Sequence, residues 1–437
     1  MLLSDPGQEL LARIAAAHPR DVPGLAEATT LRRGYPADLV AAAMAQHELR
    51  LAARAKFSRA TEMLFTRGGY EQSTSEPIAR YRALRFAGTA RIADLCCGIG
   101  GDLIALAAAS EVLAVDRDPV HARLARHNAG VYGVAGNVAA RVADVRDVDL
   151  AGTGAVFIDP ARRADARSRG TAAGGMAAGG GTTVGGTDGS VAAGTGPARR
   201  FRAGTSEPPL EWCFELAATR NPGKVPAVCV KAAPGLDTSV IPPGWEAEFI
   251  ADGRDLKEAV LWSPALATMD ATVTARRATI LSTGPAVPFG ALPAVHTLTP
   301  SPGPGVPVAR PGEFLYDPSP AVTRAGLVED LARQLGAWKI DERIAFLSTD
   351  REAATPFART LKVIDSAPWT EKRARARLRE LGVGAADLRR RGLAGDVDAI
   401  RRRLKLAGPH RATIVLTRVA DQPWGLICAD PGTPLAR

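Results

Sequence analysis

The spacing of apolar residues divides the chain into regions with different secondary structure. Residues 1–88 carry apolar positions at helical intervals, most clearly in the Ala-, Leu- and Arg-rich run over residues 37–65. That helix should end at the glycines of residues 66–69. Another helix should begin near residues 73–75, Ser-Thr-Ser, whose hydroxyls can cap it, with Pro77 in its first turn. The pattern predicts a helical N-terminal region, either a simple appendage or a platform that covers a substrate.

From residue 89 to about residue 284, short apolar runs alternate with helical segments. Strands are expected at residues 92–95, 112–116, 138–142, 155–158 and 227–231. Helices are expected from residue 102, after Pro119, and over residues 210–220. Residues 246–251 and 258–262 should form an antiparallel pair at a sheet edge. This alternation predicts an α/β fold with a doubly wound, Rossmann-like sheet.

Two segments interrupt the alternation. Residues 168–206 hold twelve glycines among thirty-nine residues and few apolar side chains, so a disordered insertion is expected there. Residues 285–311 hold eight prolines and are expected to form a semi-rigid linker. Residues 312–437 should form a separate α+β module. Its expected helices cover residues 321–335, 371–381 and 396–406, and its expected strands cover residues 344–348, 360–365, 412–416 and 424–428.

The most specific feature is a glycine-rich turn between the first expected strand and its helix. Residues 94–102 read Asp-Leu-Cys-Cys-Gly-Ile-Gly-Gly-Asp, so backbone N–H groups can approach a bound molecule closely. A dinucleotide fingerprint would place a third glycine where Leu103 stands. The leading carboxylate of Asp94 would repel a phosphate and attract an amine. Both departures favour S-adenosylmethionine over NAD.

Further acidic residues stand at the ends of the next strands. Asp116 is placed to accept the ribose hydroxyls, Asp144 to accept from the adenine amino group, and Asp159 to lie beside the sulfonium. The alternative is that these acids only cap strand ends. The expected cofactor-binding residues are Asp94, Cys96, Gly98, Gly100, Gly101, Asp116, Arg117, Asp144 and Val145. Cys96 and Cys97 are expected to be packed small residues rather than reactive thiols.

These motifs carry a resemblance to a known family. The chain resembles the bacterial class I S-adenosylmethionine-dependent methyltransferases that have a C-terminal THUMP-like domain. The matching stretches are residues 71–74, 94–102, 159–163, 313–318, 389–393 and 416–418. The resemblance implies a class I methyltransferase domain over residues 89–284 and an RNA-binding THUMP-like domain over residues 312–437. The Gly-rich insertion is a departure from the family.

The four residues from Asp159 to Arg162 bear on the reaction. Enzymes that methylate exocyclic amines usually have an acid or amide, two prolines and an aromatic residue here. Asp159 and Pro160 match, whereas Arg162 replaces the aromatic ring and could stack on a base through its guanidinium plane. Residues 231–234 hold no cysteine, which carbon-5 pyrimidine methylation would need. We therefore expect a base nitrogen as target, with Asp159, Pro160 and Arg162 as catalytic residues. The alternative for Arg162 is a simple ion pair.

The net charge of +9 arises in one segment. Residues 371–418 hold fourteen Lys and Arg against five Asp and Glu, so the rest of the chain is close to neutral. Such a segment favours a polyanion, although a solvated helix face would look similar. With the implied THUMP-like domain, the expected partner is structured RNA, either tRNA or rRNA. The expected RNA contacts are Arg373, Arg377, Arg389, Arg390, Arg391, Arg402 and Lys405.

Several other classes of protein are not expected. No run of about 18 apolar residues could cross a membrane, and the first residues do not form a signal peptide. The five cysteines form no C-x-x-C pair and the histidines are scattered, so neither a metal site nor a disulfide framework is expected. This pattern fits a cytoplasmic enzyme. Two rival functions remain: a small-molecule or protein methyltransferase, and a non-catalytic RNA-binding protein that keeps the cofactor fold.

Overall fold

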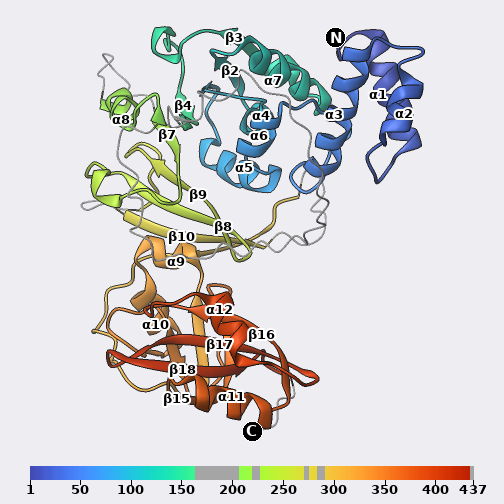
Figure 1. The fold of residues 1–437 in the computed structure, drawn as a ribbon. Helices are drawn as coiled ribbons and strands as arrows, with labels where there is room; N and C mark the ends of the chain where they lie inside the picture. Colours follow the sequence, from blue (N-terminus) through green and yellow to red (C-terminus); the bar gives the residue numbers. More distant parts are fainter. Residues whose placement is uncertain (163–205, 219–226, 270–274, 283–290, 434–437) are drawn as a thin grey trace.

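The computed structural model describes residues 1–162, 206–218, 227–269, 275–282 and 291–433 (Figure 1). Within these ranges, a group of N-terminal helices lies beside a nine-stranded sheet, and a second sheet of seven strands lies below it. The predicted disordered insertion, residues 168–206, lies outside the described residues except for Ser206. No helix in the described part of the chain is long and apolar enough to span a bilayer.

The N-terminal region is helical, as predicted, but one helix boundary differs. Its helices are α1 (Asp5–Ala17), α2 (Leu25–Leu31), α3 (Ala37–Ala53), α4 (Arg67–Gln72) and α5 (Glu76–Ala83). The glycines expected to stop the long helix lie instead inside α4. The Thr66 hydroxyl caps this helix by accepting from the Gly69 N–H at 2.9 Å. Gly69 packs directly on Ile99, where a Cβ would collide with the isoleucine side chain. Close packing therefore explains this glycine.

The large sheet has a wholly parallel half and a mixed half. Its strands are β1 (Arg91–Leu95), β2 (Glu111–Asp116), β3 (Val138–Val142), β4 (Ala155–Ile158), β7 (Ala227–Ala232), β8 (Glu246–Asp252), β9 (Asp255–Trp262), β10 (Ala275–Ser282) and β11 (Ala294–Leu298). Their order is β11-β10-β8-β9-β7-β4-β1-β2-β3, and the last five are parallel. The carboxyl ends of these five strands meet at one edge, where ligands of such sheets bind.

Helices cover both faces of the parallel half. The helices are α6 (Gly101–Ala107), α7 (Pro119–Val131) and α8 (Leu210–Ala218). On one face, Ile92 and Phe157 pack with residues of α5, α6 and α7 in one buried cluster. On the other face, Ala93 and Leu95 pack with residues of α8. The alternation along β1 places Asp94 on the face of Ile92, toward α6.

The expected linker is partly strand. Within residues 285–311, Ala294–Leu298 form β11, which pairs antiparallel with β10. Pro293 and Pro300 flank this strand, and proline is tolerated beside a strand because no ladder hydrogen bond is lost there. The predicted antiparallel pair, β8 and β9, is therefore not at the edge, since β10 and β11 lie outside it.

The second sheet is almost wholly antiparallel. Its strands are β12 (Phe314–Pro318), β13 (Trp338–Lys339), β14 (Leu347–Thr349), β15 (Ala358–Pro368), β16 (Val383–Arg390), β17 (His410–Val419) and β18 (Gln422–Ala429). Its helices are α9 (Pro320–Ala325), α10 (Val328–Leu335), α11 (Glu371–Glu380) and α12 (Val397–Leu404). The strand order is β13-β14-β12-β15-β18-β17-β16, with β16 parallel to β17. The helix expected over residues 321–335 is broken at Gly326, which adopts φ of 72°.

One hydrophobic core joins the two sheets. Phe249 of β8 and Ala278 of β10 belong to the same buried cluster as Ala321 and Ala325 of α9 and Leu331 of α10. In Figure 1, α9 lies between the two sheets. Apolar packing therefore fixes the second sheet against the first.

Candidate active site

The glycine turn has the backbone geometry that its sequence predicts. Three of its residues adopt left-handed conformations: Cys96 at φ 64°, Gly98 at φ 55° and Gly100 at φ 88°. A Cβ on Gly100 would lie 3.0 Å from Ala125 Cα in α7, so glycine also lets α7 approach. Cys96 takes this conformation at a steric cost, because non-glycine residues rarely adopt it. The turn leads into α6, whose first residue is Gly101.

Asp94 lies at the bottom of this turn and is fully buried. Among the described residues, neither of its carboxylate oxygens has a hydrogen-bond partner. Burial, reinforced by the nearby carboxylates of Asp102 and Asp159, raises the pKa of Asp94 well above its usual value. A buried carboxylate of this kind fits a cationic donor. S-adenosylmethionine carries an ammonium and a sulfonium, so the residues present fit this cofactor.

The next two strand ends present oriented carboxylates. Asp116 accepts from the backbone N–H groups of Gly98 and Asp118, both at 2.9 Å. Burial acts against its ionised form, but these bonds and His121 together lower the pKa of Asp116. Asp144 is held by the Arg146 guanidinium at 2.9 and 2.7 Å, which lowers the pKa of Asp144 to about 2. Both groups stay ionised at neutral pH and keep further lone pairs for a ligand.

The remaining expected cofactor residues flank these carboxylates. Arg117 follows Asp116 and is exposed, whereas Val145 follows Asp144 and is buried. Burial raises the pKa of the Cys96 thiol and that of the Cys97 thiol, as expected of packed side chains. The structure thus brings the predicted residues to one edge of the sheet, while their contact with a cofactor stays a prediction.

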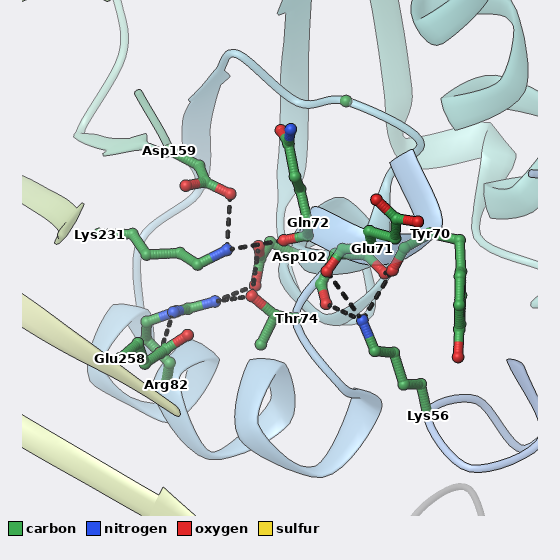
Figure 2. A network of polar contacts seen from close by, with 12 residues as sticks. Lys56, Tyr70, Glu71, Gln72, Thr74, Arg82, Asp102, Asp159, Lys231 and Glu258 are labelled. Atoms are coloured by element: carbon green, nitrogen blue, oxygen red, sulfur yellow. Dashed lines mark hydrogen bonds and ion pairs between the residues drawn. The ribbon is translucent and has the colours of Figure 1, made fainter. Parts of the chain in front are cut away.

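Asp159 follows β4 and has a partner that the sequence did not predict. Figure 2 shows Lys231, from β7, reaching Asp159 with its Nζ 2.7 Å from Oδ2. The same Nζ donates to the Gln72 carbonyl at 3.5 Å. Burial raises the pKa of Asp159 and Lys231 opposes this rise, while Asp159 keeps the pKa of Lys231 above its usual value. A partly exposed carboxylate and a charged amine therefore stand together at the carboxyl edge.

Arg82 forms a second, deeper ion-pair centre beneath this pair (Figure 2). Its guanidinium, 2% exposed, pairs with Asp102 of α6 and Glu258 of β9, and lies 4.7 Å from the centre of the Phe157 ring. Burial opposes its charge, but the two carboxylates outweigh burial and raise the pKa of Arg82. The helical spacing in the sequence indicates that Arg82 is buried, because it lies one helical turn after Ile78, on the buried face of α5.

Lys56 fixes the loop that connects α4 with α5 over the site. Its Nζ donates to the carbonyls of Tyr70 at 2.7 Å and Ser73 at 2.9 Å. Burial, with the positive charges of Lys231 and Lys257, lowers the pKa of Lys56 to about 8. The same loop carries Thr74, which donates to Asp102 at 3.2 Å. The N-terminal helices are thus attached to the site, which favours the platform over the simple appendage.

The chain after Asp159 leaves the large sheet and forms a short strand. Pro160 is buried, and Ala161–Arg162 form the short strand β5, which pairs antiparallel with β6 (Ser206–Glu207). The side chain of Arg162 lies outside the described residues, so its stacking role stays a prediction. Cys229 is fully buried inside β7, in the core. Within the described ranges, no cluster of His, Cys, Asp or Glu could hold a metal ion.

The predicted RNA contacts lie in the second sheet and its helices, and most are ion-paired within the protein. Arg373 lies 3.0 Å from Asp365, Arg377 lies 3.0 Å from Glu380, and Asp317 receives Arg391 at 2.9 Å and Arg389 at 3.7 Å. Arg390 donates to the Gly395 carbonyl. Arg402 and Lys405 are exposed. Since exposed ion pairs are weak, they leave these side chains able to contact phosphate.

The fold and the site together define a class of protein. The parallel order β7-β4-β1-β2-β3, the antiparallel β9, the glycine turn and the acids at the strand ends define a class I S-adenosylmethionine-dependent methyltransferase. An uncharacterized S-adenosylmethionine-dependent methyltransferase of Mycobacterium tuberculosis is 33% identical over 367 residues, which span 82% of this chain and 86% of that protein. The chain belongs to this family of S-adenosylmethionine-dependent methyltransferases. The predicted family, fold class, enzyme class and cofactor are thereby confirmed.

Family models match three separate regions. Residues 89–169 match the RNA cap guanine-N2 methyltransferase family, residues 358–430 match the THUMP domain-like family, and residues 1–53 match a domain of unknown function. The crystal structure of a proposed methyltransferase from Porphyromonas gingivalis W83 superimposes with a TM-score of 0.71 at 19% identity. It covers 99% of this chain and 100% of its own, so the fold extends over both sheets.

Proposed function

We propose that this methyltransferase modifies a base nitrogen in structured RNA, either tRNA or rRNA, which the C-terminal module holds. The observation that carries this proposal is Asp159, a partly exposed carboxylate at the carboxyl end of β4, which lies between β7, the strand of Lys231, and β1, the strand of Asp94. The matches to an RNA guanine-N2 methyltransferase family and to a THUMP-like family support an RNA substrate. In this proposal the catalytic domain includes β11, and residues 1–88 and 312–437 flank it in a cytoplasmic protein.

Different residues of the site have different roles in methyl transfer. S-adenosylmethionine, when bound, supplies an electrophilic methyl group on its sulfonium. Asp94 and the glycine turn would hold its amino-acid end, while Asp116 and Asp144 would hold its ribose and adenine. Asp159 accepts an N–H of the target amine and aligns the nitrogen lone pair. The amine loses one proton overall, and a carboxylate with a raised pKa is a better acceptor for it.

Lys231 favours a second candidate, the ribose 2′-hydroxyl. A hydroxyl must lose its proton as it attacks, and a nearby cation stabilises the negative charge that develops on oxygen. Lys231 Nζ, 2.7 Å from Asp159 Oδ2, is such a cation. A hydroxyl target also needs no aromatic ring for base stacking, which would agree with arginine at position 162. The two candidates share Asp159 and differ in the role of Lys231.

Nucleoside mass spectrometry on tRNA and rRNA from a deletion strain separates these candidates. Loss of a base-methylated nucleoside, restored by the wild-type gene and not by Asp159→Asn, is the expected result. Loss of a 2′-O-methylated nucleoside would instead favour the second candidate. A 2′-O-methyl group also protects the RNA chain from alkaline cleavage, so this protection should be lost as well. Unchanged RNA nucleosides, together with no methyl transfer to RNA by the purified protein, would overturn an RNA substrate. That outcome would favour a small molecule or a protein instead.

A further inference from the structure

The β8–β9 hairpin reaches from the candidate active site toward the second sheet. Strand β9 runs antiparallel to β7, with Ala259 opposite Ala232, so the residues before Ala259 continue past the carboxyl end of β7. Glu258 thereby reaches Arg82 in the site. The turn at Gly253 and Arg254 lies farther out on the same edge. Four residues of extended chain place Arg254 about 13 Å from Glu258.

Arg254 stands at the tip of this hairpin without a carboxylate of its own. Within the described part of the chain, no Asp or Glu lies at ion-pair distance from its guanidinium, whereas the neighbouring Lys257 pairs with Asp255 at 3.3 Å. Burial, followed by the positive charges of Arg359 and Arg389, lowers the pKa of Arg254. The hairpin tip therefore lies close to Arg359 and Arg389 of the second sheet, and also to Asp317 and Asp430.

The second sheet contributes oriented arginines to the same place. Arg359 lies 2.9 Å from Asp430, and Arg389 lies 3.7 Å from Asp317. The group comprises five arginines, Arg254, Arg359, Arg389, Arg391 and Arg411, and three aspartates, Asp317, Asp387 and Asp430. Its net charge is +2. The aspartates fix the guanidinium groups in position without neutralising the group.

The shared core keeps the two sides of this group together. Asp317 lies in β12, three residues before α9, and α9 packs on β8 and β10 in the common hydrophobic cluster. Figure 1 shows this helix at the junction of the two sheets. The spacing between the hairpin arginine and the arginines of the second sheet is thus set by packing, as a preformed anion site requires.

We propose that Arg254, Arg359 and Arg389 form a phosphate-binding site for the RNA backbone at the junction of the catalytic sheet and the THUMP-like module. This inference rests on the proposed RNA substrate. Guanidinium groups bind phosphate oxygens in a bidentate manner, which suits them better than lysine for a fixed site. The hairpin then links the site to Glu258, so an RNA strand bound there is guided toward Asp159.

The test uses the full-length protein with labelled bulk bacterial tRNA and, separately, labelled rRNA, and the dissociation constant is measured over a series of salt concentrations. Arg254→Gln should weaken binding by about tenfold at physiological salt and reduce the salt slope by about one phosphate. Arg254→Lys keeps the charge and should give an intermediate loss. Arg20→Gln, at an exposed arginine of the N-terminal region, is the matched control and should bind as the wild type does.

Two results would overturn this site, and they have different meanings. Wild-type affinity and salt slope in Arg254→Gln, with salt-sensitive binding by the wild type, would refute the junction site alone. No salt-sensitive binding of tRNA or rRNA by the wild type would refute the proposed function and this site with it. S-adenosylmethionine affinity and the melting temperature should be unchanged in Arg254→Gln, since the removed guanidinium has no ion-pair partner among the described residues.

Discussion

The site has a cofactor side, formed by Asp94, Asp116 and Asp144, and a target side, formed by Asp159 and the ion pairs around it. The carboxylates of the two sides are held in different ways. On the cofactor side, Asp116 and Asp144 are oriented by groups two to eighteen residues away, and Asp94 has no hydrogen-bond partner in the described structure. On the target side, Asp159 and Glu258 are held by Lys231 and Arg82, which are 72 and 176 residues away in the sequence. The first side is built from local turns, the second from long-range ion pairs. Substitutions should therefore impair ligand binding on one side, and chemistry or folding on the other.

The largest effect is expected for Asp159→Asn. The amide keeps the size of the side chain but cannot accept a proton, so the methyl-transfer rate should fall by about 10²- to 10⁴-fold. The dissociation constant for S-adenosylmethionine, measured by calorimetry, should change little. A variant with near wild-type turnover would show that Asp159 is not the acceptor and would remove the difference between the two sides.

Arg82→Met should produce the next largest effect, on stability rather than on binding. Removing the guanidinium leaves Asp102 and Glu258 buried without their cation, which typically costs about 3–5 kcal/mol. Chemical denaturation should show a lower free energy of unfolding, with Arg20→Met as the exposed control. The triple variant Arg82→Met, Asp102→Asn, Glu258→Gln should recover part of the loss. An unchanged denaturation midpoint in Arg82→Met would contradict the ion-pair centre.

Asp116→Ala should weaken cofactor binding by about 10- to 100-fold, the cost of losing hydrogen bonds to one charged group. The fold should persist, because the partners of Asp116, which are Gly98, Asp118 and His121, are only partly buried. Titration calorimetry with S-adenosylhomocysteine would measure the change. Equal affinity in the variant and the wild type would refute the ribose assignment.

The smallest effect concerns pH and Lys56. In the folded protein the pKa of Lys56 is lowered to about 8, below its usual value of 10.5. The unfolded chain therefore binds more protons between pH 8 and pH 10.5. The free energy of unfolding should therefore gain a favourable contribution from Lys56 as pH rises from about 8 to about 10.5. Denaturant titrations at several pH values should show a shallower rise in Lys56→Met. Parallel curves for the two proteins would argue against a depressed pKa.

The parts of the fold that sequence reasoning predicted are those set by local patterns. The strand, turn and helix around residues 94–102 follow from an apolar run, closely spaced glycines and an acid in the first turn of the helix. Sequence reasoning missed β16, because its Arg and Asp residues interrupt the apolar alternation and its partner strand β17 lies twenty-six residues later over most of the register. Sequence reasoning also missed α4, because Gly69 packs against Ile99 and does not end a helix.

The target side was predictable only in part, for a related reason. Asp159 stands in a recognisable segment after a strand, so its position could be predicted. Lys231 is seventy-two residues later, and its contact with Asp159 depends on the parallel pairing of β4 with β7. Arg82 and Glu258 are farther apart still. No pattern along the chain joins such residues before the sheet order is known.

The most direct measurement of the central claim is transfer of a labelled methyl group from S-adenosylmethionine to purified tRNA and rRNA, with wild-type protein and Asp159→Asn side by side. RNA from the deletion strain is the substrate, because its target position is unmethylated. The account predicts label in one RNA nucleoside with the wild-type protein and at most about one hundredth of that rate with the variant. Label in no RNA nucleoside, from a protein that binds S-adenosylmethionine, would contradict it.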